Sequence, residues 1–565
     1  MTIFPRPRSP VGSGYGWRAF SAALAGGLIS VSLSSSAQEA STTVDVTVLA
    51  INDFNGNLMP PAGGIAIADP IDRTKKIAVP AGGVESMATL IHQLRANHRN
   101  SIFVAAGDLI GASPLLSALF HDEPTVESLS LMGLEASTVG NHEFDEGPVE
   151  LLRMQNGDCH PKDGCKGPHP FTGATYRYLA ASTIDKATGK TILPPYYLKT
   201  FDGISVAFIG LTLKGTPDIV TPSGTAGLEF KDEAETVNAL VPQLRSQGIE
   251  AIVVLIHEGG TPTGDYNECP GISGRIADIV PKLDRAVDVV VSGHTHQAYN
   301  CVIDGRLVTS AHRYGTLVTE IDLKLDTRTH DVVSARAENL IVRNDRLAKD
   351  AEQTKLLAAY QIVAAPLANR VVGSVTELLS RDQNQAGESP LGDLIADAEL
   401  AATKPVEKGG AQIAFMNRGG IRADIVKRGN GEVTYADLFA VQPFGNLEVT
   451  LTLTGAQIKT LLEWQWSDPV DPGIFQVSQG FSYSWDAMRV DGDKVLPGSM
   501  SLGGKTIEPT ATYRVTVPDI SADSVVLKDG TDRMTKMPDI EASEAYFRAN
   551  SPISLHPLGR IRRVN

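Results

Sequence analysis

Long hydrophobic runs are missing from this sequence of 565 residues, of which 42% are hydrophobic and 6% aromatic. A membrane-spanning helix needs ~18 or more consecutive apolar residues. The one apolar segment near the N-terminus is interrupted by Gly26 and Gly27. Internal repeats and low-complexity segments are also absent after that segment. The sequence is therefore that of an ordinary globular protein rather than of a helical membrane protein or a repeat protein.

Positive charge is also in short supply. The 50 Lys and Arg residues face 65 Asp and Glu residues, which gives a formal net charge of −15. A strongly acidic protein repels polyanions, so the composition argues against a nucleic-acid partner. A small anionic substrate is compatible with this charge only where local cations, such as metal ions, reverse the sign of the field.

The first 37 residues have the pattern of a secretory signal peptide. Arg6, Arg8 and Arg18 form a positive head, "AFSAALAGGLISV" is a short apolar stretch, and "SSSAQ" supplies small residues for cleavage before Gln38. We therefore expect a periplasmic or secreted protein, whose charge after cleavage is −18. A membrane anchor is the alternative, but the apolar stretch is too short to span a bilayer.

Cysteine is rare, with four residues in the whole chain. An even number in an exported protein suggests two disulfides. Of the three possible pairings we favour Cys159–Cys165, within the loop "GDCHPKDGCKG", together with Cys269–Cys301. Metal binding by these thiols is the alternative, but the chain lacks the tight Cys-x-x-Cys spacing of such sites.

The length exceeds what one hydrophobic core supports, so two large domains are expected. From residue 44 to 345, short apolar runs alternate with amphipathic segments, which predicts an α/β domain with a layered sheet core. Residues 346–368 are typical of a connecting helix. In residues 369–565 the strands become longer and more alternating around one strong helix, "SPLGDLIADAELAAT". This pattern predicts a second domain of the α+β class.

Five apolar runs of the first domain end in residues that can ligate a metal ion. These residues are Asp53, Asp108, Asn141 with His142 and Asp145, His257, and His294 with His296. Ligands of open α/β folds lie outside the carboxyl ends of the strands, so we expect these groups at one rim. A single Asp after a strand is usually a turn or a helix cap, but five such endings indicate a shared site. Their mixture of carboxylate, imidazole and amide suits zinc, manganese, iron or cobalt better than magnesium, and we expect two ions, of zinc, manganese or cobalt.

The blocks "ND", "GDLIGASP", "GNHEFDEG", "LIHEGG" and "SGHTHQ", in this order, resemble the calcineurin-like metallophosphoesterase signature. With the second domain included, the chain resembles the bacterial periplasmic 5'-nucleotidase/UDP-sugar hydrolase family. The resemblance implies an N-terminal four-layer α/β sandwich, a connecting helix and a C-terminal α+β domain that binds the substrate.

The resemblance also implies a role for each residue of the site. Asp53 and His296 would hold the first metal ion, and Asp108 would bridge both ions. Asn141, His257 and His294 would hold the second ion. His142, paired with Asp145, would contact the phosphoryl group and the leaving oxygen, and a metal-bound hydroxide would be the nucleophile.

Asn55 departs from the family pattern, which has a histidine ligand at this position. An amide oxygen can ligate a metal ion but donates less well than imidazole, and His296 can compensate for it. Asn55 is therefore either a ligand of the first ion or a residue of a structural turn.

In the second domain, "QIAFMNRGGIRADI" contains a glycine turn followed by an arginine. The glycines allow close approach of a ligand, and Arg422 can present a planar fork to an anion; a tight turn with a solvated arginine is the alternative. By the resemblance, Arg381, Asn417 and Arg422 would bind the nucleotide, and Phe444 would stack on its base. The family's second stacking aromatic, in a "GGDGF" loop, is replaced by "PDISADSVVLKDGTDR", and Arg418 replaces a small residue.

The function that the resemblance implies is hydrolysis of nucleoside 5'-monophosphates to nucleoside and phosphate. The alternatives on the same scaffold are a 2',3'-cyclic-nucleotide phosphodiesterase/3'-nucleotidase and a UDP-sugar pyrophosphatase. A non-catalytic protein that captures nucleotides is the alternative from another class, and the presence of His142 and Asp145 argues against it.

Overall fold

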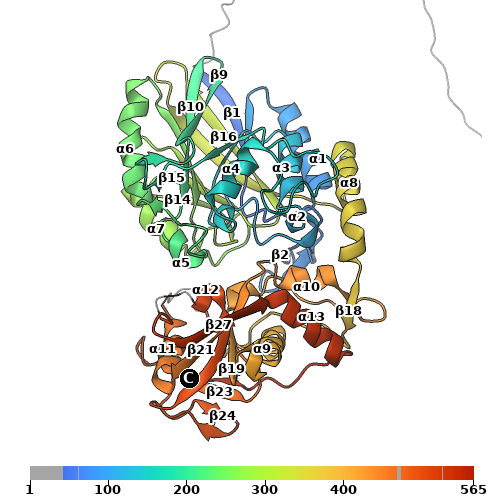
Figure 1. The fold of residues 1–565 in the computed structure, drawn as a ribbon. Coiled ribbons are helices and arrows are strands. Elements are labelled where there is room, and N and C mark those ends of the chain that lie inside the picture. The colour runs from blue at the N-terminus through green and yellow to red at the C-terminus, as the bar shows by residue number, and fades with distance from the viewer. Residues whose placement is uncertain (1–41, 62, 468–472, 523, 525) are drawn as a thin grey trace, which may run out of the picture. The chain divides into compact units, whose positions relative to one another are not determined.

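The computed structural model describes residues 42–61, 63–467, 473–522, 524 and 526–565 (Figure 1). The predicted signal peptide lies outside the described residues. None of the helices in the described part of the chain is long and apolar enough to cross a membrane. Residues Thr42–Asn565 form one compact unit.

The first sheet of the N-terminal half has six strands in the order β17-β16-β1-β4-β5-β6. Its parallel strands are β1 (Thr43–Ile51), β4 (Ser101–Ala106), β5 (Ala136–Thr138) and β6 (Arg177–Leu179). The antiparallel strands β16 (Leu317–Asp326) and β17 (Val332–Ile341) extend it at the β1 edge. Ile51 pairs with Ala105, so β1 and β4 end at the same level. This register brings the polar residues that follow the two strands together.

The second sheet also has six strands, in the order β14-β15-β13-β12-β10-β9. These are β9 (Tyr196–Phe201), β10 (Ile204–Thr212), β12 (Ala251–His257), β13 (Val289–Ser292), β14 (Ala298–Ile303) and β15 (Arg306–Ala311). One buried cluster contains Val48 and Val104 of the first sheet and Phe208 and Val253 of the second. The two sheets therefore pack face to face across a shared apolar layer.

Helices cover the outer face of each sheet. Helices α1 (Val84–Asn97), α3 (Glu123–Leu131) and α4 (Pro148–Asn156) share a core with β1 and β4. Helices α6 (Glu233–Ser246) and α7 (Arg275–Ile279) share a core with β10 and β12. The resulting four layers confirm the predicted α/β sandwich.

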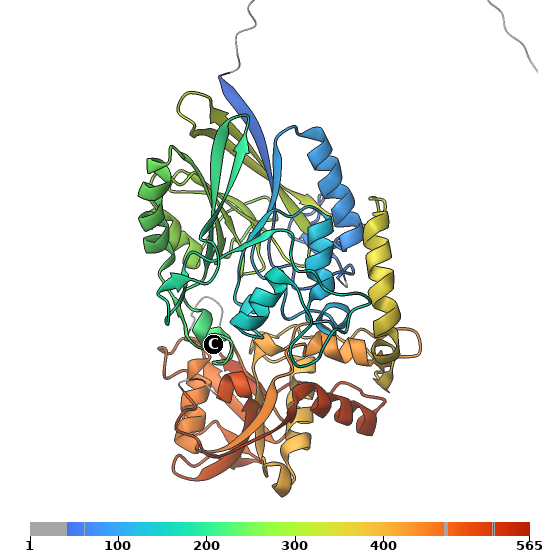
Figure 2. The same ribbon diagram turned by 45° about the horizontal axis from the view of Figure 1, so that its top comes forward.

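Helix α8 (Ala351–Ala368) follows this sandwich and lies beside α1 and α3 in both views (Figures 1 and 2). It begins at Ala351 rather than at the predicted residue 346, because the Asp350 side chain accepts hydrogen bonds from the N–H groups of residues 352 and 353. Such a cap satisfies orphan donors of the first turn and marks the start of a helix. Gln353 fixes α8 to α3 through two hydrogen bonds with Ser128.

The C-terminal part is built on a five-stranded sheet of order β22-β19-β26-β21-β27. The strands are β19 (Ile413–Met416), β21 (Leu447–Thr454), β22 (Gln476–Val477), β26 (Thr512–Pro518) and β27 (Thr531–Pro538). Its longer helices are α9 (Pro390–Thr403), α10 (Tyr435–Val441), α11 (Gly455–Trp464) and α13 (Asp539–Asn550). Mixed strand directions with separate helices confirm the predicted α+β class.

The remaining elements are short. They are β2 (Ile65–Ala68), β3 (Lys76–Val79), α2 (Leu115–Ala118), η1 (His142–Phe144), β7 (Thr183–Asp185), β8 (Lys190–Thr191), α5 (Thr216–Ile219), β11 (Leu228–Phe230), η2 (Val280–Lys282), β18 (Val371–Ser374), η3 (Val406–Lys408), η4 (Arg418–Gly420), β20 (Glu432–Thr434), β23 (Phe481–Asp486), β24 (Ser501–Leu502), β25 (Lys505–Thr506), α12 (Asp519–Ala522) and β28 (Ile561–Val564).

Both predicted disulfides are present. Cys159 pairs with Cys165 and Cys269 pairs with Cys301, with Cα atoms 4.6 and 5.2 Å apart. Since every cysteine is paired in this way, the thiols are not ligands of a metal ion.

Candidate active site

The candidate ligands follow strands of both sheets of the sandwich. Asp53, Asp108 and Asn141 come after β1, β4 and β5 of the first sheet. His257 is the last residue of β12, and His294 follows β13 of the second sheet. The site is therefore formed where the carboxyl ends of two facing sheets meet, rather than along one sheet alone.

Asp108 makes contacts with residues of both sheets. Its Oδ2 lies 2.9 Å from His257 Nε2, and its Oδ1 accepts a hydrogen bond of 3.0 Å from the backbone N–H of His142. One ligand atom from each of Asp108, His257 and His294 lies within 4.8 Å of the other two. The Asp108 and His257 side chains are at most 2% exposed, so their charges are not screened by water.

The tautomer of His257 shows what this cluster requires. Nδ1 donates to the Ala106 carbonyl oxygen at 2.8 Å, so when the ring is neutral its lone pair is on Nε2. Nε2 faces the Asp108 carboxylate without a partner of hydrogen-bond geometry. Burial lowers the pKa of His257, but the Asp108 carboxylate outweighs burial and raises it to about 10. The pair therefore demands a cation, and a metal ion between the two atoms would supply it.

Asp53 is held by a dense set of donors. Its two oxygens accept hydrogen bonds from the backbone N–H of His294 at 3.1 and 3.0 Å, and Oδ2 accepts another from Asn52 Nδ2 at 2.6 Å. Mainly through burial, the pKa values of His294 and His296 are lowered to about 4. Both imidazoles are therefore neutral at neutral pH, the state that metal ligation needs.

His296 has a more specific orientation. Its Nε2 lies 3.3 Å from Asp53 Oδ1, and its Nδ1 lies 3.3 Å from Arg313 Nη1. A guanidinium can only donate, so Nδ1 is the acceptor and the ring proton is on Nε2, facing Asp53. In this orientation His296 supports Asp53, and its role as a ligand of the first metal ion stays a prediction.

Two buried amide oxygens at the site have no hydrogen-bond partner: Asn55 Oδ1 and Asn141 Oδ1. The amide nitrogen of Asn55 is engaged, since it donates to the Gly111 carbonyl oxygen at 3.1 Å. A buried acceptor without a donor is costly, and ligation of a metal ion would remove that cost. The donor set thus fits a divalent metal centre, and Asn55 has a free oxygen for it.

The backbone is strained at these positions. Asp53, Asn55, Asp108, His294 and His296 have φ values of 49°, 44°, 49°, 69° and 56°. The left-handed region costs a non-glycine residue on the order of 1–2 kcal/mol. Such outliers cluster where the surrounding structure imposes a functional geometry.

His142 and Asp145 form the predicted pair. His142 Nδ1 lies 2.8 Å from Asp145 Oδ2. Burial lowers the pKa of His142, but Asp145 and Asp108 together raise it above its usual value. Gly111 packs against the pair, and a Cβ at this residue would lie 2.7 Å from His142 Cβ and 2.9 Å from Asp145 Oδ2. Only glycine fits this close approach.

Glu143 is a site residue that sequence reasoning missed. Its buried carboxylate accepts hydrogen bonds from the backbone N–H groups of Asp108, Leu109 and Gly140 at 3.0, 2.8 and 2.5 Å. It thereby ties the turn after β4 to the turn after β5. Its position between His142 and Phe144 was the only available signal, because a glutamate in a turn gives no pattern of its own.

Two of the predicted substrate residues of the C-terminal part, Arg381 and Arg422, line a cavity together with this centre. A cavity of about 1750 Å³ is lined by Asp108, Asn141, His142, His294, His296, Arg381 and Arg422. The Arg381 Nη1 donates to the carbonyl oxygens of residues 421 and 422 at 2.8 and 2.6 Å. Asn417 does not line the cavity, but its buried Oδ1 has no partner.

The Phe444 ring packs against the imidazole of His142 instead of facing an open binding pocket. Its ring is stacked against the imidazole of His142, with centroids 5.6 Å apart and planes at 19°. The Arg422 guanidinium lies 5.7 Å from the centre of the Phe444 ring. In this arrangement Phe444 contacts the His142 side chain itself, which the sequence did not indicate.

Family models match both parts of the chain. Residues 46–298 match the calcineurin-like phosphoesterase model, and residues 371–526 match the 5'-nucleotidase, C-terminal domain model. The chain belongs to the 5'-nucleotidase family of metallophosphoesterases. Members of this class are hydrolases of phosphoesters with a dinuclear metal site, and the convergence of Asp108, His257 and His294 provides candidate ligands for such a site.

Individual relatives agree with this membership. The chain is 33% identical over 526 residues to the endonuclease YhcR of Bacillus subtilis, covering 92% of this chain but only 41% of that protein. It is 26% identical over 574 residues to the 5'-nucleotidase of Vibrio cholerae, covering 93% and 94% of the two chains. The crystal structure of a 5'-nucleotidase precursor from Thermus thermophilus superposes with a TM-score of 0.74, at 25% identity, over 92% of this chain and all of the other.

Proposed function

We propose that this protein is a 5'-nucleotidase that hydrolyses nucleoside 5'-monophosphates to nucleoside and phosphate. The observation that carries the proposal is the His142–Asp145 pair. The backbone N–H of His142 donates a hydrogen bond to Asp108, which lies in the cluster of candidate ligands. A phosphoester held at the cluster would thus lie beside a histidine that can hold a proton. The relative from Vibrio cholerae, which matches over nearly its full length, has this activity in its name.

The metal centre would be held by Asp53, Asp108, Asn141, His257 and His294, with Asn55 and His296 as further candidates. Two divalent ions, of which zinc, manganese and cobalt suit these donors, would activate water and neutralise phosphate charge. The chain's own residues do the rest. His142 holds a proton for the leaving oxygen, and Asp145 keeps the ring proton on Nδ1. Glu143 keeps the two turns that carry Asp108 and Asn141 in place.

Arginines favour an anionic substrate in this cavity. Arg313, Arg381 and Arg422 line it, and in the part of the chain that the structure describes no carboxylate forms an ion pair with any of them. Carboxylates such as Asp108, Asp382 and Asp424 also line the cavity, and the arginines set positive charge beside them that would attract a phosphate. Arg422, Asn417 and Phe444 would contact the nucleoside part.

The same arginines support a second candidate, a substrate with two phosphate groups or a phosphodiester. Three guanidiniums line the cavity without an ion pair among the described residues, which is more than one terminal phosphate needs, and the second stacking ring of the family is missing. Release of phosphate from AMP, 3'-AMP, 2',3'-cyclic AMP and UDP-glucose, measured with and without added manganese, separates the candidates. Turnover of AMP below that of all the other three would reject the 5'-nucleotidase proposal, and no turnover of any would reject catalysis.

Export from the cytoplasm is part of the proposal. Two disulfides in a chain of this size are typical of an oxidising compartment. N-terminal sequencing of the protein recovered from the periplasm or medium should begin at Gln38. Recovery of the protein only from the cytoplasm, with Met1 retained, would contradict export.

A further inference from the structure

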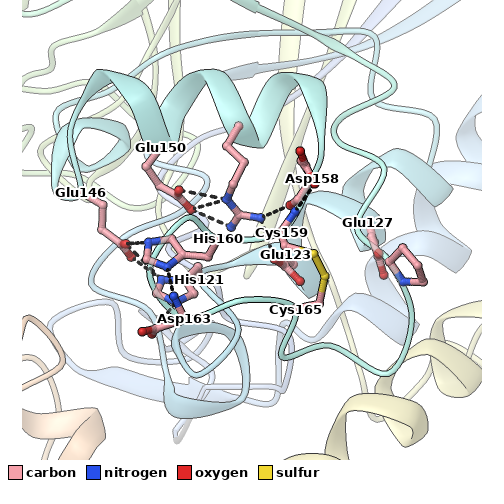
Figure 3. A network of polar contacts seen from close by, with 12 residues as sticks. His121, Glu123, Glu127, Glu146, Glu150, Asp158, Cys159, His160, Asp163 and Cys165 are labelled. Carbon is pink, nitrogen blue, oxygen red and sulfur yellow. Dashed lines mark hydrogen bonds and ion pairs between the residues drawn. A yellow bond between two sulfur atoms is a disulfide. The ribbon is translucent and has the colours of Figure 1, made fainter.

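A second cluster of metal-ligating side chains lies outside the active site. It consists of His121, Glu146, Glu150 and His160, and one ligand atom from each lies within 4.8 Å of the other three (Figure 3). The four residues come from three separate places in the chain: the turn before α3, the start of α4 and the loop closed by the Cys159–Cys165 disulfide. We call these four residues the His121 cluster.

The two imidazoles of the cluster are stacked. Their centroids are 3.8 Å apart and their planes differ by 11°. His121 Nδ1 lies 3.1 and 3.0 Å from the two oxygens of Glu146, and His160 Nε2 lies 3.6 Å from one of them. Both histidine side chains are more than 80% buried, at 14% and 11% exposure. Two rings thus present nitrogen atoms to one carboxylate, Glu146, which is 48% exposed. Since ring nitrogens donate in the ring plane, the two rings must tilt out of their stack before both can ligate one ion.

Negative charge exceeds permanent positive charge here. The carboxylates of Glu123, Glu146, Glu150 and Asp163 surround the cluster, and the permanent cations in contact with them are Arg153 and Lys166. Arg153 is engaged by Glu150 and Glu123, so it leaves Glu146 to the histidines. His121 lies between Glu146 and Asp163, with one ring nitrogen facing each, which requires a protonated ring. A proton therefore supplies the missing charge in the arrangement seen here.

We propose that the His121 cluster is a third metal site, which binds a divalent transition ion of the zinc type. His121 Nδ1, His160 Nε2 and a Glu146 oxygen would be the ligands, and Glu150 would supply a fourth oxygen or hold the shell through Arg153. Two imidazoles and carboxylate oxygens are a usual donor set for zinc. The ion would link the disulfide loop to the turn before α3 and to α4, so its role is structural.

Binding changes two hydrogen bonds in a defined way. The ion replaces the proton on His121 Nδ1, while Nε2 keeps its proton toward Asp163 Oδ2. His160 Nδ1 now accepts from the backbone N–H of Asp163 at 3.1 Å. Once Nε2 ligates the ion, the ring proton of His160 must move to Nδ1, and that backbone N–H must turn away. Zinc binding should therefore move the Asp163 part of the loop.

The experiment counts zinc in the full-length protein. After dialysis against a zinc buffer and removal of loose metal, elemental analysis should find three zinc ions per chain. His160→Gln and Glu146→Gln should each bind two. His169→Gln is the matched control, because His169 lies in the same region but outside the cluster, and it should bind three. Asp108→Asn, which leaves the cluster intact, should keep at least one zinc ion.

Thermal melting tests the structural role separately from any catalytic activity. Zinc should raise the Tm of the wild type and of His169→Gln more than that of His160→Gln, since a ligand that binds only the folded state stabilises it. A wild-type chain that binds no more zinc than His160→Gln and Glu146→Gln would overturn the proposal. Binding of a third zinc ion by His160→Gln and Glu146→Gln, as by the wild type, would overturn it too, because the third ion would then be an adventitious ion only. Because these readouts need no substrate, they stand or fall independently of the 5'-nucleotidase assignment.

Discussion

Removal of His142 is the sharpest test of the proposed mechanism. His142→Ala should lower kcat by ~10²–10⁴, the range for a positioned acid–base group. Its metal content should stay normal, because His142 contacts the Asp108 carboxylate only through its backbone N–H, which alanine retains. The side chain itself is committed to Asp145 through Nδ1.

The expected size of the Asp145 effect follows from its contact. The bond between Asp145 Oδ2 and His142 Nδ1 is 2.8 Å long and involves an ionised carboxylate. Hydrogen bonds to charged groups contribute about 1.5–3 kcal/mol, and each 1.4 kcal/mol is a factor of ~10. Asp145→Asn should therefore lower kcat by ~10–100-fold, less than His142→Ala, because an asparagine oxygen can still accept from Nδ1.

The double variant decides whether the two residues act as one unit. If Asp145 acts only through His142, the Asp145→Asn change should cost little in a chain that already carries His142→Ala. The assay is the initial rate of phosphate release from AMP, with zinc content measured on the same samples. Multiplicative losses in the double variant, or an unchanged kcat in His142→Ala, would refute the reasoning. Loss of metal in His142→Ala would instead show that His142 is a ligand.

Three further predictions follow from individual contacts. Asn55→His should tighten the first metal site, because imidazole donates better than an amide oxygen; competition with a graded chelator measures this, and weaker retention would place Asn55 outside the ligand shell. Phe444→Ala should lower kcat/KM for p-nitrophenyl phosphate by up to ~10-fold, because the ring packs on His142 and an aromatic pair contributes about that much. For AMP the variant should lose a further ~1–3 kcal/mol, the contribution of base stacking. Equal losses on both substrates would argue against stacking. Burial and neighbouring carboxylates raise the pKa of Glu448 well above its ordinary value. Above the ordinary glutamate pKa, the folded protein therefore keeps a proton on Glu448 that the unfolded protein releases. The free energy of unfolding falls as the pH rises through this range. Glu448→Gln should thus stabilise the protein by about 1–3 kcal/mol at pH 8 and less at pH 5 in urea unfolding, with exposed Glu541→Gln as the control; an equal gain at both pH values would contradict this.

The sequence predicted the layers and most of the centre because the evidence for them is local. An apolar run that ends in Asp53 or Asp108 predicts a buried strand and also shows that the polar group lies at the carboxyl end of that strand. The pairing of β1 with β4 and of β12 with β13 could not be read in the same way, because it depends on contacts between distant residues. The sequence therefore did not show that the ligands come from two facing sheets.

Other features depend on loops whose course has no periodicity. Glu143 accepts hydrogen bonds from three backbone N–H groups, and the sequence around Glu143 does not predict these bonds. His121 and His160 are separated by α3, β5, η1 and α4, and their stacking depends on a loop that the Cys159–Cys165 disulfide closes. Phe444 was predicted from the family resemblance to stack on a base, and its packing against His142 appears only when the C-terminal part is placed.

The candidate active site is assembled at a local cost that the rest of the fold must offset. Asp53 and Asp108 are buried carboxylates on strained backbone, and His257 needs a cation beside it. Glu143 offsets part of this by satisfying three backbone donors in the turns that carry the ligands. Bound metal ions would offset more, because ligands that bind only the folded state stabilise it. The candidate ligands would thus tie the geometry of the centre to metal occupancy.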